Sequence, residues 1–213
     1  MVSPASNKLR FDLKVIASWI EPGSRVLDLG CGHGDLLAWL KEHKQVRGTG
    51  IEQDKEKAAA CIGRGLSVLQ GDLRDEVEDY PDDSFDVVIL SQTLQQVYQP
   101  DILLKSLARI GRQVIVSFPN FSHYRIRLQL LFGGQAPKSR ELPFSWYDTP
   151  NIRVITLADF RKFAREVGYT ILEECAINSQ DQERSGKIVS HFSNLFATYG
   201  IFLIEKNKLY AVE

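Results

Sequence analysis

The sequence predicts an α/β protein with a doubly wound, mostly parallel sheet of seven strands and an insertion after the fifth strand. Two observations support this prediction. Short apolar runs alternate with segments of helical periodicity along most of the chain. The first apolar run, residues 26–29, ends in a glycine-rich turn that leads directly into a helix-like segment. We therefore expect a single domain over residues 1–213, without internal repeats or a linker.

Each element is predicted from its own residue pattern. Helical spacing of apolar residues indicates the first helix, and Asp54 can cap the third. Continuous apolar runs are typical of buried parallel strands. The carboxylate-rich stretch 72–86 is expected to be mostly a solvated loop. In chain order we expect a helix over about 7–20, strand 26–29, a helix from 36, strand 48–52, helix 55–62, strand 67–70, strand 85–90, helix 101–110 and strand 113–118.

Two closing strands are expected near the end of the chain. Thr156 and Asp159 match a capping box, and Ile155 and Phe160 can form a hydrophobic staple. A helix should therefore begin there and end before Gly168. Residues 169–177 and 195–205 then form the last two strands, the final one antiparallel and hairpin-like beside its neighbour.

Composition narrows the functional classes. A formal net charge of −1 argues against nucleic-acid binding driven by overall charge. Three cysteines without metal-type spacing argue against a disulfide framework or a metal site. No secretory signal and no apolar run of membrane-spanning length is recognisable. These features predict a soluble protein of a reducing, cytoplasmic compartment.

The run Asp28-Leu29-Gly30-Cys31-Gly32-His33-Gly34-Asp35 predicts a ligand site. Glycines allow a tight turn and a close approach of the backbone to a ligand, and the helix that follows offers free N–H groups. The dinucleotide fingerprint would need a small residue where Asp35 stands, so an NAD-dependent oxidoreductase ranks last. The D-x-G-x-G-x-G form instead resembles motif I of the class I S-adenosylmethionine (SAM) methyltransferases. A strand-turn-helix with glycines that serve only packing is the alternative.

Two further carboxylates follow strands in the same order. Glu52 ends the second strand, where an acidic group can accept both ribose hydroxyl protons; otherwise it is a surface carboxylate. Asp72 follows the third strand, where class I methyltransferases commonly contact the adenine amino group; otherwise it is a turn or cap residue. The resemblance implies a site for SAM or S-adenosylhomocysteine made of Asp28, Gly30, Cys31, Gly32, Gly34, Glu52, Gln53, Asp72, Leu73 and Ser91.

The insertion, about residues 119–153, gathers aromatic and basic residues after the fifth strand. A long irregular segment at the carboxyl edge of an open sheet suggests a lid, an acceptor pocket or a partner surface. The alternative is a helix over about 124–132 whose apolar face docks on the sheet. If methyl transfer occurs, the candidate catalytic groups are His123, Tyr124 and Tyr147, although a single histidine is more often structural.

The glycine loop, residues 117–121 (SFPNF) and residues 146–152 (WYDTPNI) together resemble the MetW family of methionine-biosynthesis proteins, over about residues 10–200. The resemblance implies a Rossmann-like class I methyltransferase fold. It also implies a hetero-oligomer with homoserine O-acyltransferase, whose activity such a protein supports; whether that partner uses an acetyl or a succinyl donor stays open.

Two functions compete. The first is a SAM-binding accessory subunit that regulates homoserine acylation, and the second is an active methyltransferase with a small-molecule or protein acceptor. Ser91-Gln92-Thr93-Leu94 replaces the Asn/Asp-Pro-Pro-aromatic motif of amino-methylating nucleic-acid enzymes, which disfavours a DNA or RNA substrate. Whether the chain is itself an enzyme is not decided by its sequence.

Overall fold

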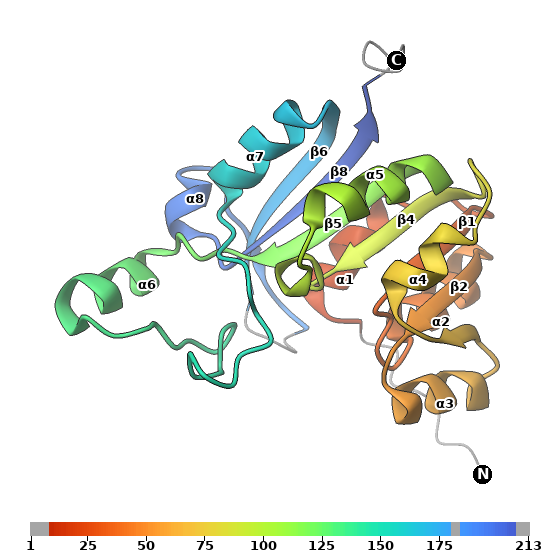
Figure 1. Ribbon diagram of the computed structural model, residues 1–213, viewed down its shortest axis with the longest axis horizontal. Helices are drawn as coiled ribbons and strands as arrows, with labels where there is room; N and C mark the ends of the chain where they lie inside the picture. The colour runs from red at the N-terminus through yellow and green to blue at the C-terminus, as the bar shows by residue number, and fades with distance from the viewer. Residues whose placement is uncertain (1–8, 180–183, 208–213) are drawn as a thin grey trace.

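The computed structural model describes residues 9–179 and 184–207, and within them one mixed sheet in the order β3-β2-β1-β4-β5-β8-β6-β7 (Figure 1). Neighbouring strands from β3 to β5 are parallel, and β8 runs antiparallel to both β5 and β6. The strands are β1 (Arg25–Leu29), β2 (Arg47–Glu52), β3 (Ser67–Gln70), β4 (Phe85–Ser91), β5 (Gly111–Pro119), β6 (Tyr169–Asn178), β7 (Lys187–Ile188) and β8 (Tyr199–Lys206). The predicted α/β architecture is confirmed, with the two-residue β7 added to the seven expected strands.

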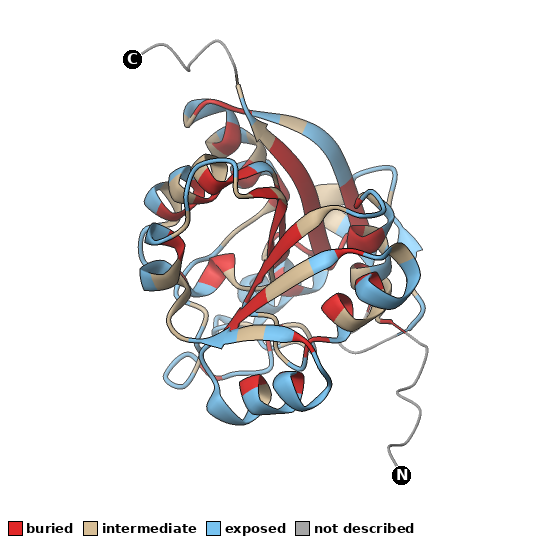
Figure 2. Cartoon of the chain, turned by 90° about the vertical axis from the view of Figure 1, so that its right-hand side faces the viewer, coloured by how far each residue is buried: buried red, intermediate tan, exposed pale blue. Residues whose placement is uncertain are grey.

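Helices cover both faces of the sheet, and the central strands are buried along their length (Figure 2). One apolar cluster packs α4, α5 and α7 against one face, and a second packs α1 and α2 against the other. The helices are α1 (Phe11–Ser18), α2 (Asp35–Lys44), α3 (Lys55–Gly63), α4 (Leu73–Glu78), η1 (Leu94–Gln96), α5 (Pro100–Ile110), α6 (Tyr124–Leu128), η2 (Gln129–Gly133), α7 (Leu157–Glu166) and α8 (Ser193–Phe196).

Two predicted helix starts are made by the side chains expected. Asp54 accepts hydrogen bonds from the N–H groups of Glu56 and Lys57 at the start of α3. Thr156 accepts one from the N–H of Asp159 at 3.1 Å, and Phe160 is buried behind it. A cap satisfies N–H groups that have no partner within the helix, so local sequence is enough to place these two ends.

Three predicted boundaries change. Residues 72–86 are not mostly a loop, because α4 forms there with Asp72 as its cap and Val77 fully buried. The last strand begins at Tyr199 rather than 195, since a turn at Phe192 (φ +50°) starts α8 first. The first helix begins at Phe11, and residues 7 and 8 of its expected span lie outside the described residues. No helix in the described ranges is long and apolar enough to cross a membrane.

Candidate functional site

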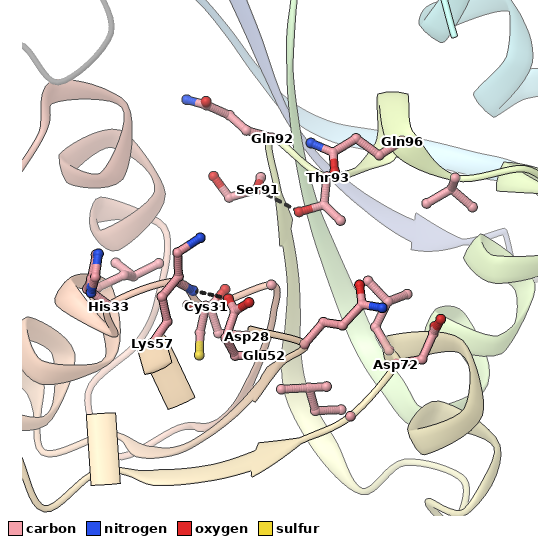
Figure 3. Close-up of a pocket in the computed structure, with 18 of the residues that line it drawn as sticks. Asp28, Cys31, His33, Glu52, Lys57, Asp72, Ser91, Gln92, Thr93 and Gln96 are labelled. Carbon is pink, nitrogen blue, oxygen red and sulfur yellow. Dashed lines mark hydrogen bonds between the residues drawn. The ribbon is translucent and has the colours of Figure 1, made fainter. Parts of the chain in front are cut away.

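A pocket of about 690 Å³ opens where β1, β2 and β4 end at the carboxyl edge of the sheet (Figure 3). Every residue predicted to hold the cofactor lines this pocket except Gly34. The reason for convergence is topological: parallel strands that are hydrogen-bonded in register bring their carboxyl ends, and the loops that follow, to one edge. The predicted residues are therefore brought together by the sheet itself.

The three glycines of the loop all have positive φ but serve different purposes. A Cβ on Gly34 would lie 2.5 Å from Leu66 and 2.9 Å from the Cys61 sulfur, so this glycine permits α2 and α3 to approach. A Cβ on Gly30 would lie 2.9 Å from the hydroxyl of Thr93. At Gly32, with φ +57°, nothing lies within 4 Å, so its backbone faces open space in the pocket. Of the three glycines, only Gly32 leaves empty a part of the pocket that a side chain would otherwise occupy.

Glu52 is a fixed, buried carboxylate and not a surface one. Its side chain accepts a hydrogen bond from the N–H of Gly32 at 2.7 Å (Figure 3). It also accepts one from the N–H of Asp54 at 2.9 Å. The residue is only 8% exposed. Each carboxylate oxygen has a further lone pair, so the group can accept two more hydrogen bonds from a ligand such as a sugar diol.

Asp28 lies beside Glu52 and is more deeply buried. Burial, with a smaller contribution from the charge of neighbouring Glu52, raises the pKa of Asp28 to about 7, and Arg10 opposes the shift. Desolvation makes the charged form of a carboxyl costly unless a cation or donor compensates it. Two carboxyls at one pocket wall therefore favour a ligand that brings hydroxyl groups or positive charge.

Asp72 is a helix cap that also lines the pocket. It caps α4 through the N–H of Arg74, and the Arg74 guanidinium contacts both of its oxygens. These hydrogen bonds hold the pKa of Asp72 below its ordinary value. Asp72 and Leu73 nevertheless line the pocket, on the side of β3. The cap interpretation is confirmed, and it places the carboxylate where a ligand can reach it.

Sequence reasoning missed two parts of the pocket wall. The first is α1, which contributes Arg10 and Leu13; the second is the loop after β4, including Gln92. They are joined by Asp12, which is buried and accepts hydrogen bonds from Arg10 and, at 2.9 Å, from the Gln92 amide. The local sequence signal for the loop after β4 is a polar run directly after an apolar strand. Gln92 has a φ of +52°, but because it is not a glycine the sequence does not indicate this backbone conformation.

Cys31 and Cys61 are neighbouring thiols beneath the glycine loop. The Cys61 thiol donates to the carbonyl of Gly32 at 3.2 Å. Burial raises the pKa of the Cys31 thiol well above its ordinary range, with nearby Asp28 adding to the effect. A thiol in this state is a poor nucleophile. No group of three or more potential metal ligands occurs in the described ranges.

The three candidate catalytic residues lie away from this pocket. His123 and Tyr124 line a separate cavity of about 410 Å³, and Tyr147 lies 73% exposed beside another groove. Burial lowers the pKa of His123, so its imidazole is neutral near pH 7. His123 instead helps to cap α6, with Nδ1 facing the N–H of Arg125. The structure does not bring these three residues to the glycine-loop pocket.

The helix of the insertion does not dock its apolar face on the sheet. Ile126 is buried, but Leu131 is 74% exposed and Phe132 is 81% exposed. That alternative is therefore wrong: the short α6 is held at its beginning, whereas η2 carries its apolar side chains into solvent.

The chain matches the family model described as "Methionine biosynthesis protein MetW" over residues 10–204. It belongs to the MetW family. It is 38% identical over 180 residues to the "Bifunctional methionine biosynthesis protein MetXA/MetW" of Rhodopirellula baltica, a match covering 80% of this chain and 29% of that protein. A "Ubiquinone/menaquinone biosynthesis C-methyltransferase UbiE" of Stenotrophomonas maltophilia is 33% identical over 106 residues, covering 45% of this chain and 41% of that protein. The chain thus spans less than half the length of these relatives.

Solved structures show the same fold at low identity. A SAM-dependent methyltransferase from Archaeoglobus fulgidus aligns with a TM-score of 0.65 at 16% identity, covering 92% of this chain and 91% of the other. A SAM-dependent methyltransferase from Thermotoga maritima, described as a possible histamine N-methyltransferase, gives 0.63 at 18% identity, covering 92% and 87%. The [4+2]-cyclase SpnF gives 0.62 at 16% identity, covering 92% and 80%. This MetW-family chain therefore has the class I methyltransferase fold, which is not by itself tied to one reaction.

Proposed function

We propose that this MetW-family protein binds SAM, or its product S-adenosylhomocysteine, in the glycine-loop pocket. The observation that supports this most is Glu52, which is buried, fixed by two backbone N–H groups and still able to accept hydrogen bonds at the pocket wall. The ribose diol of SAM is a donor pair that suits it. Asp28 and Glu52 also suit a ligand that carries a positive sulfonium and an ammonium group. When bound, SAM supplies an electrophilic methyl group and this positive charge.

We further propose that the protein is an accessory subunit of homoserine O-acyltransferase in methionine biosynthesis. The support is the Rhodopirellula baltica relative, whose name joins MetXA and MetW in one bifunctional chain. Most of that chain lies outside the match, which leaves room for a second enzyme. Two activities joined covalently in one organism are often associated non-covalently in another, and the family resemblance implies the acyltransferase as the partner.

The pocket and the insertion are linked by a direct contact that could carry regulation. The loop that contains η1 lines the pocket with Thr93, Val97 and Tyr98. The carbonyl of Gln95 in the same loop accepts hydrogen bonds at 3.0 Å from the N–H groups of both Ile152 and Arg153, and the Arg153 guanidinium donates to the carbonyls of Val97 and Tyr98. A ligand that shifts this loop would shift the end of the insertion, which is what linkage between two sites requires.

A mixing experiment tests the accessory role. Purified chain is added to homoserine O-acyltransferase of the same organism, with and without SAM, while complex formation and the acyl-transfer rate are measured. We expect a complex at micromolar concentrations or below and a rate that changes when the chain is added. If no complex and no change in rate are found with or without SAM, the accessory role is rejected.

Methyl transfer is the second candidate, favoured by the match to a protein named as a C-methyltransferase. Among pocket-lining residues, His33 and the exposed Tyr98 carry groups that can accept a proton. Incubation of the chain with SAM and cell extract, followed by measurement of S-adenosylhomocysteine, tests this function. Formation above the level given by Gly32→Val supports methyl transfer, whereas equal levels exclude it for the acceptors present.

A further inference from the structure

The insertion exposes apolar side chains on two adjacent segments. One is the end of α6 and η2, and the other is the loop around residue 146; Figure 1 shows both projecting beyond the edge of the sheet. A groove between them is lined by Gln129, Gly133, Trp146 and Tyr147 among others. We call this the arm surface, defined by Leu128, Leu130, Leu131, Phe132, Trp146 and Tyr147, which are 46, 50, 74, 81, 78 and 73% exposed.

This exposure is not a failure of the insertion to fold. Ile126 and Leu142 are buried, Lys138 exchanges two hydrogen bonds with Gln129, and Ser139 pairs with Leu142. The backbone is therefore held while the apolar groups point outward. A contiguous exposed apolar patch on a folded segment is typical of an interaction site, since each such side chain loses favourable burial when it stays in water.

Three cations next to the arm surface form no direct salt bridge among the described residues, although the charge of Glu141 contributes to raising the pKa of Arg125. Arg125, Lys138 and Arg140 are exposed, and none of them forms an ion pair with another described residue. On the body of the protein, by contrast, Arg25 and Arg161 pair with Asp86 and Glu174. Unpaired cations at the rim of an apolar patch suit a partner whose own patch is bordered by Asp and Glu.

We propose that the arm surface is the site at which this chain docks on homoserine O-acyltransferase, in an apolar recess with an acidic rim. The inference rests on the proposed accessory function and assigns its interface. A second copy of this chain fits less well, because a twofold interface places the same patch on both subunits and would bring the cations Arg125, Lys138 and Arg140 of one subunit toward the same set of cations on the other. Nucleic acid fits less well because three of the six side chains are leucines, which offer bases no aromatic face for stacking.

The experiment compares variants of the arm surface with matched changes elsewhere. Phe132→Asp and Leu131→Asp place a charge in the patch, and Ile62→Asp does the same at a 57% exposed position on α3. Lys138→Glu with Arg140→Glu reverses the rim charge, and Lys105→Glu on α5 is the control. Affinity and binding kinetics for the acyltransferase are measured, and circular dichroism and SAM calorimetry check that each variant is folded.

We expect Phe132→Asp to weaken the complex by about tenfold or more, mainly through faster dissociation. The rim reversal should slow association and reduce its salt dependence. Ile62→Asp and Lys105→Glu should bind as the wild type does. If the wild type binds and the arm variants bind equally well, the interface assignment is overturned while the accessory function stands. If the wild type does not bind, both are overturned. Self-association that Phe132→Asp abolishes, without acyltransferase binding, would identify a second copy as the occupant.

Discussion

The glycine-loop pocket follows the carboxyl end of the parallel strand β1, and the insertion follows that of β5. The two regions differ in whether their side chains find partners within the chain. In the pocket, the buried Glu52 carboxylate is held by neighbouring N–H groups, and the partly exposed Asp72 carboxylate is held by an arginine. In the insertion, aromatic and leucine side chains stay in water beside cations that have no ion-pair partner among the described residues. The Glu52 and Asp72 carboxylates find their partners within the chain, whereas we propose that the arm surface is covered by a second molecule.

This difference separates recognition of a ligand from recognition of a partner. A pocket that meets its own hydrogen-bond requirements can be rigid before the ligand arrives, which lowers the cost of binding. A surface that leaves apolar groups exposed gains its stability on association. The loop that contains η1 contacts both regions, so it is the element through which one could influence the other.

The largest expected effect on stability comes from adding a side chain at Gly34 in the glycine loop. Gly34→Val should destabilise the fold by about 3 kcal/mol, because its φ is +72° and its Cβ would overlap Leu66 and Cys61. The matched change in the insertion is Gly134→Val, at φ +58° with nothing within 4 Å, which should cost only about 1–2 kcal/mol. Urea unfolding measures both, and equal costs would show that the two regions are packed alike.

Stability should depend on pH in opposite directions in the two regions. Asp28 has a pKa raised from 3.8 to about 7, so the folded state binds its proton more tightly and stability falls as pH rises from about 4 to 7. A shift of this size corresponds to a few kcal/mol, roughly 1.4 kcal/mol per pKa unit. Asp28→Asn should therefore flatten the unfolding free energy over this range.

His123 has the opposite sign, because its pKa is lowered by burial and the unfolded chain binds the proton more tightly. Its contribution is present above about pH 6.5 and is lost as pH falls through the folded-state pKa. His123→Gln should reduce the loss of stability at acid pH and leave the Asp28 range unchanged. An Asp28→Asn variant with the wild-type pH profile would contradict the assignment of the pocket carboxyl.

A smaller effect is expected from Glu52→Ala. Removal of this carboxylate leaves the Gly32 N–H without its acceptor and removes two acceptor oxygens from the pocket. The dissociation constant for SAM should rise by about tenfold or more, which is roughly 1.5–3 kcal/mol for a hydrogen bond to a charged group. Isothermal titration calorimetry measures it. The control is Glu56→Ala, an exposed carboxylate on α3, which should bind SAM as the wild type does.

The smallest expected effect on stability comes from removing only the side-chain contacts between the insertion and the loop that contains η1. Arg153→Met removes the side-chain hydrogen bonds to the carbonyls of Val97 and Tyr98 but keeps the backbone ones to Gln95. Stability should fall by about 1 kcal/mol or less. SAM and acyltransferase should each still bind, while the influence of one on the affinity for the other decreases. An unchanged influence would mean that this contact does not link the regions.

Most of the fold could be predicted because local patterns and topology agree. The continuous apolar runs of β1, β4 and β5 and the caps Asp54 and Thr156 depend on nearby residues alone. The carboxyl-edge position of Glu52 and Asp72 followed from strand order. α4 was missed because charge dominates residues 72–86 and one buried residue, Val77, decides that the segment is helical.

The unpredicted parts of the site depend on contacts between distant residues. Arg10 lines the pocket and donates to Asp12, which also accepts a hydrogen bond from the distant Gln92 amide. The aromatic and basic character of the insertion suggested a partner surface, a lid or an acceptor pocket, and the proposal of a partner surface rests on side-chain exposure that the sequence does not reveal. Phe132 at 81% exposed and His123 at 6% could not be distinguished from sequence spacing.

We propose that the glycine-loop pocket and the arm surface are energetically linked. The most direct test is to measure the SAM affinity of this chain with and without saturating homoserine O-acyltransferase, and the acyltransferase affinity with and without saturating SAM. Linkage requires both ratios to be the same factor, and typical couplings are about 5- to 150-fold. We predict equal ratios that differ from one. Tight binding of both molecules with each ratio equal to one would contradict the account, since the two regions would then act independently.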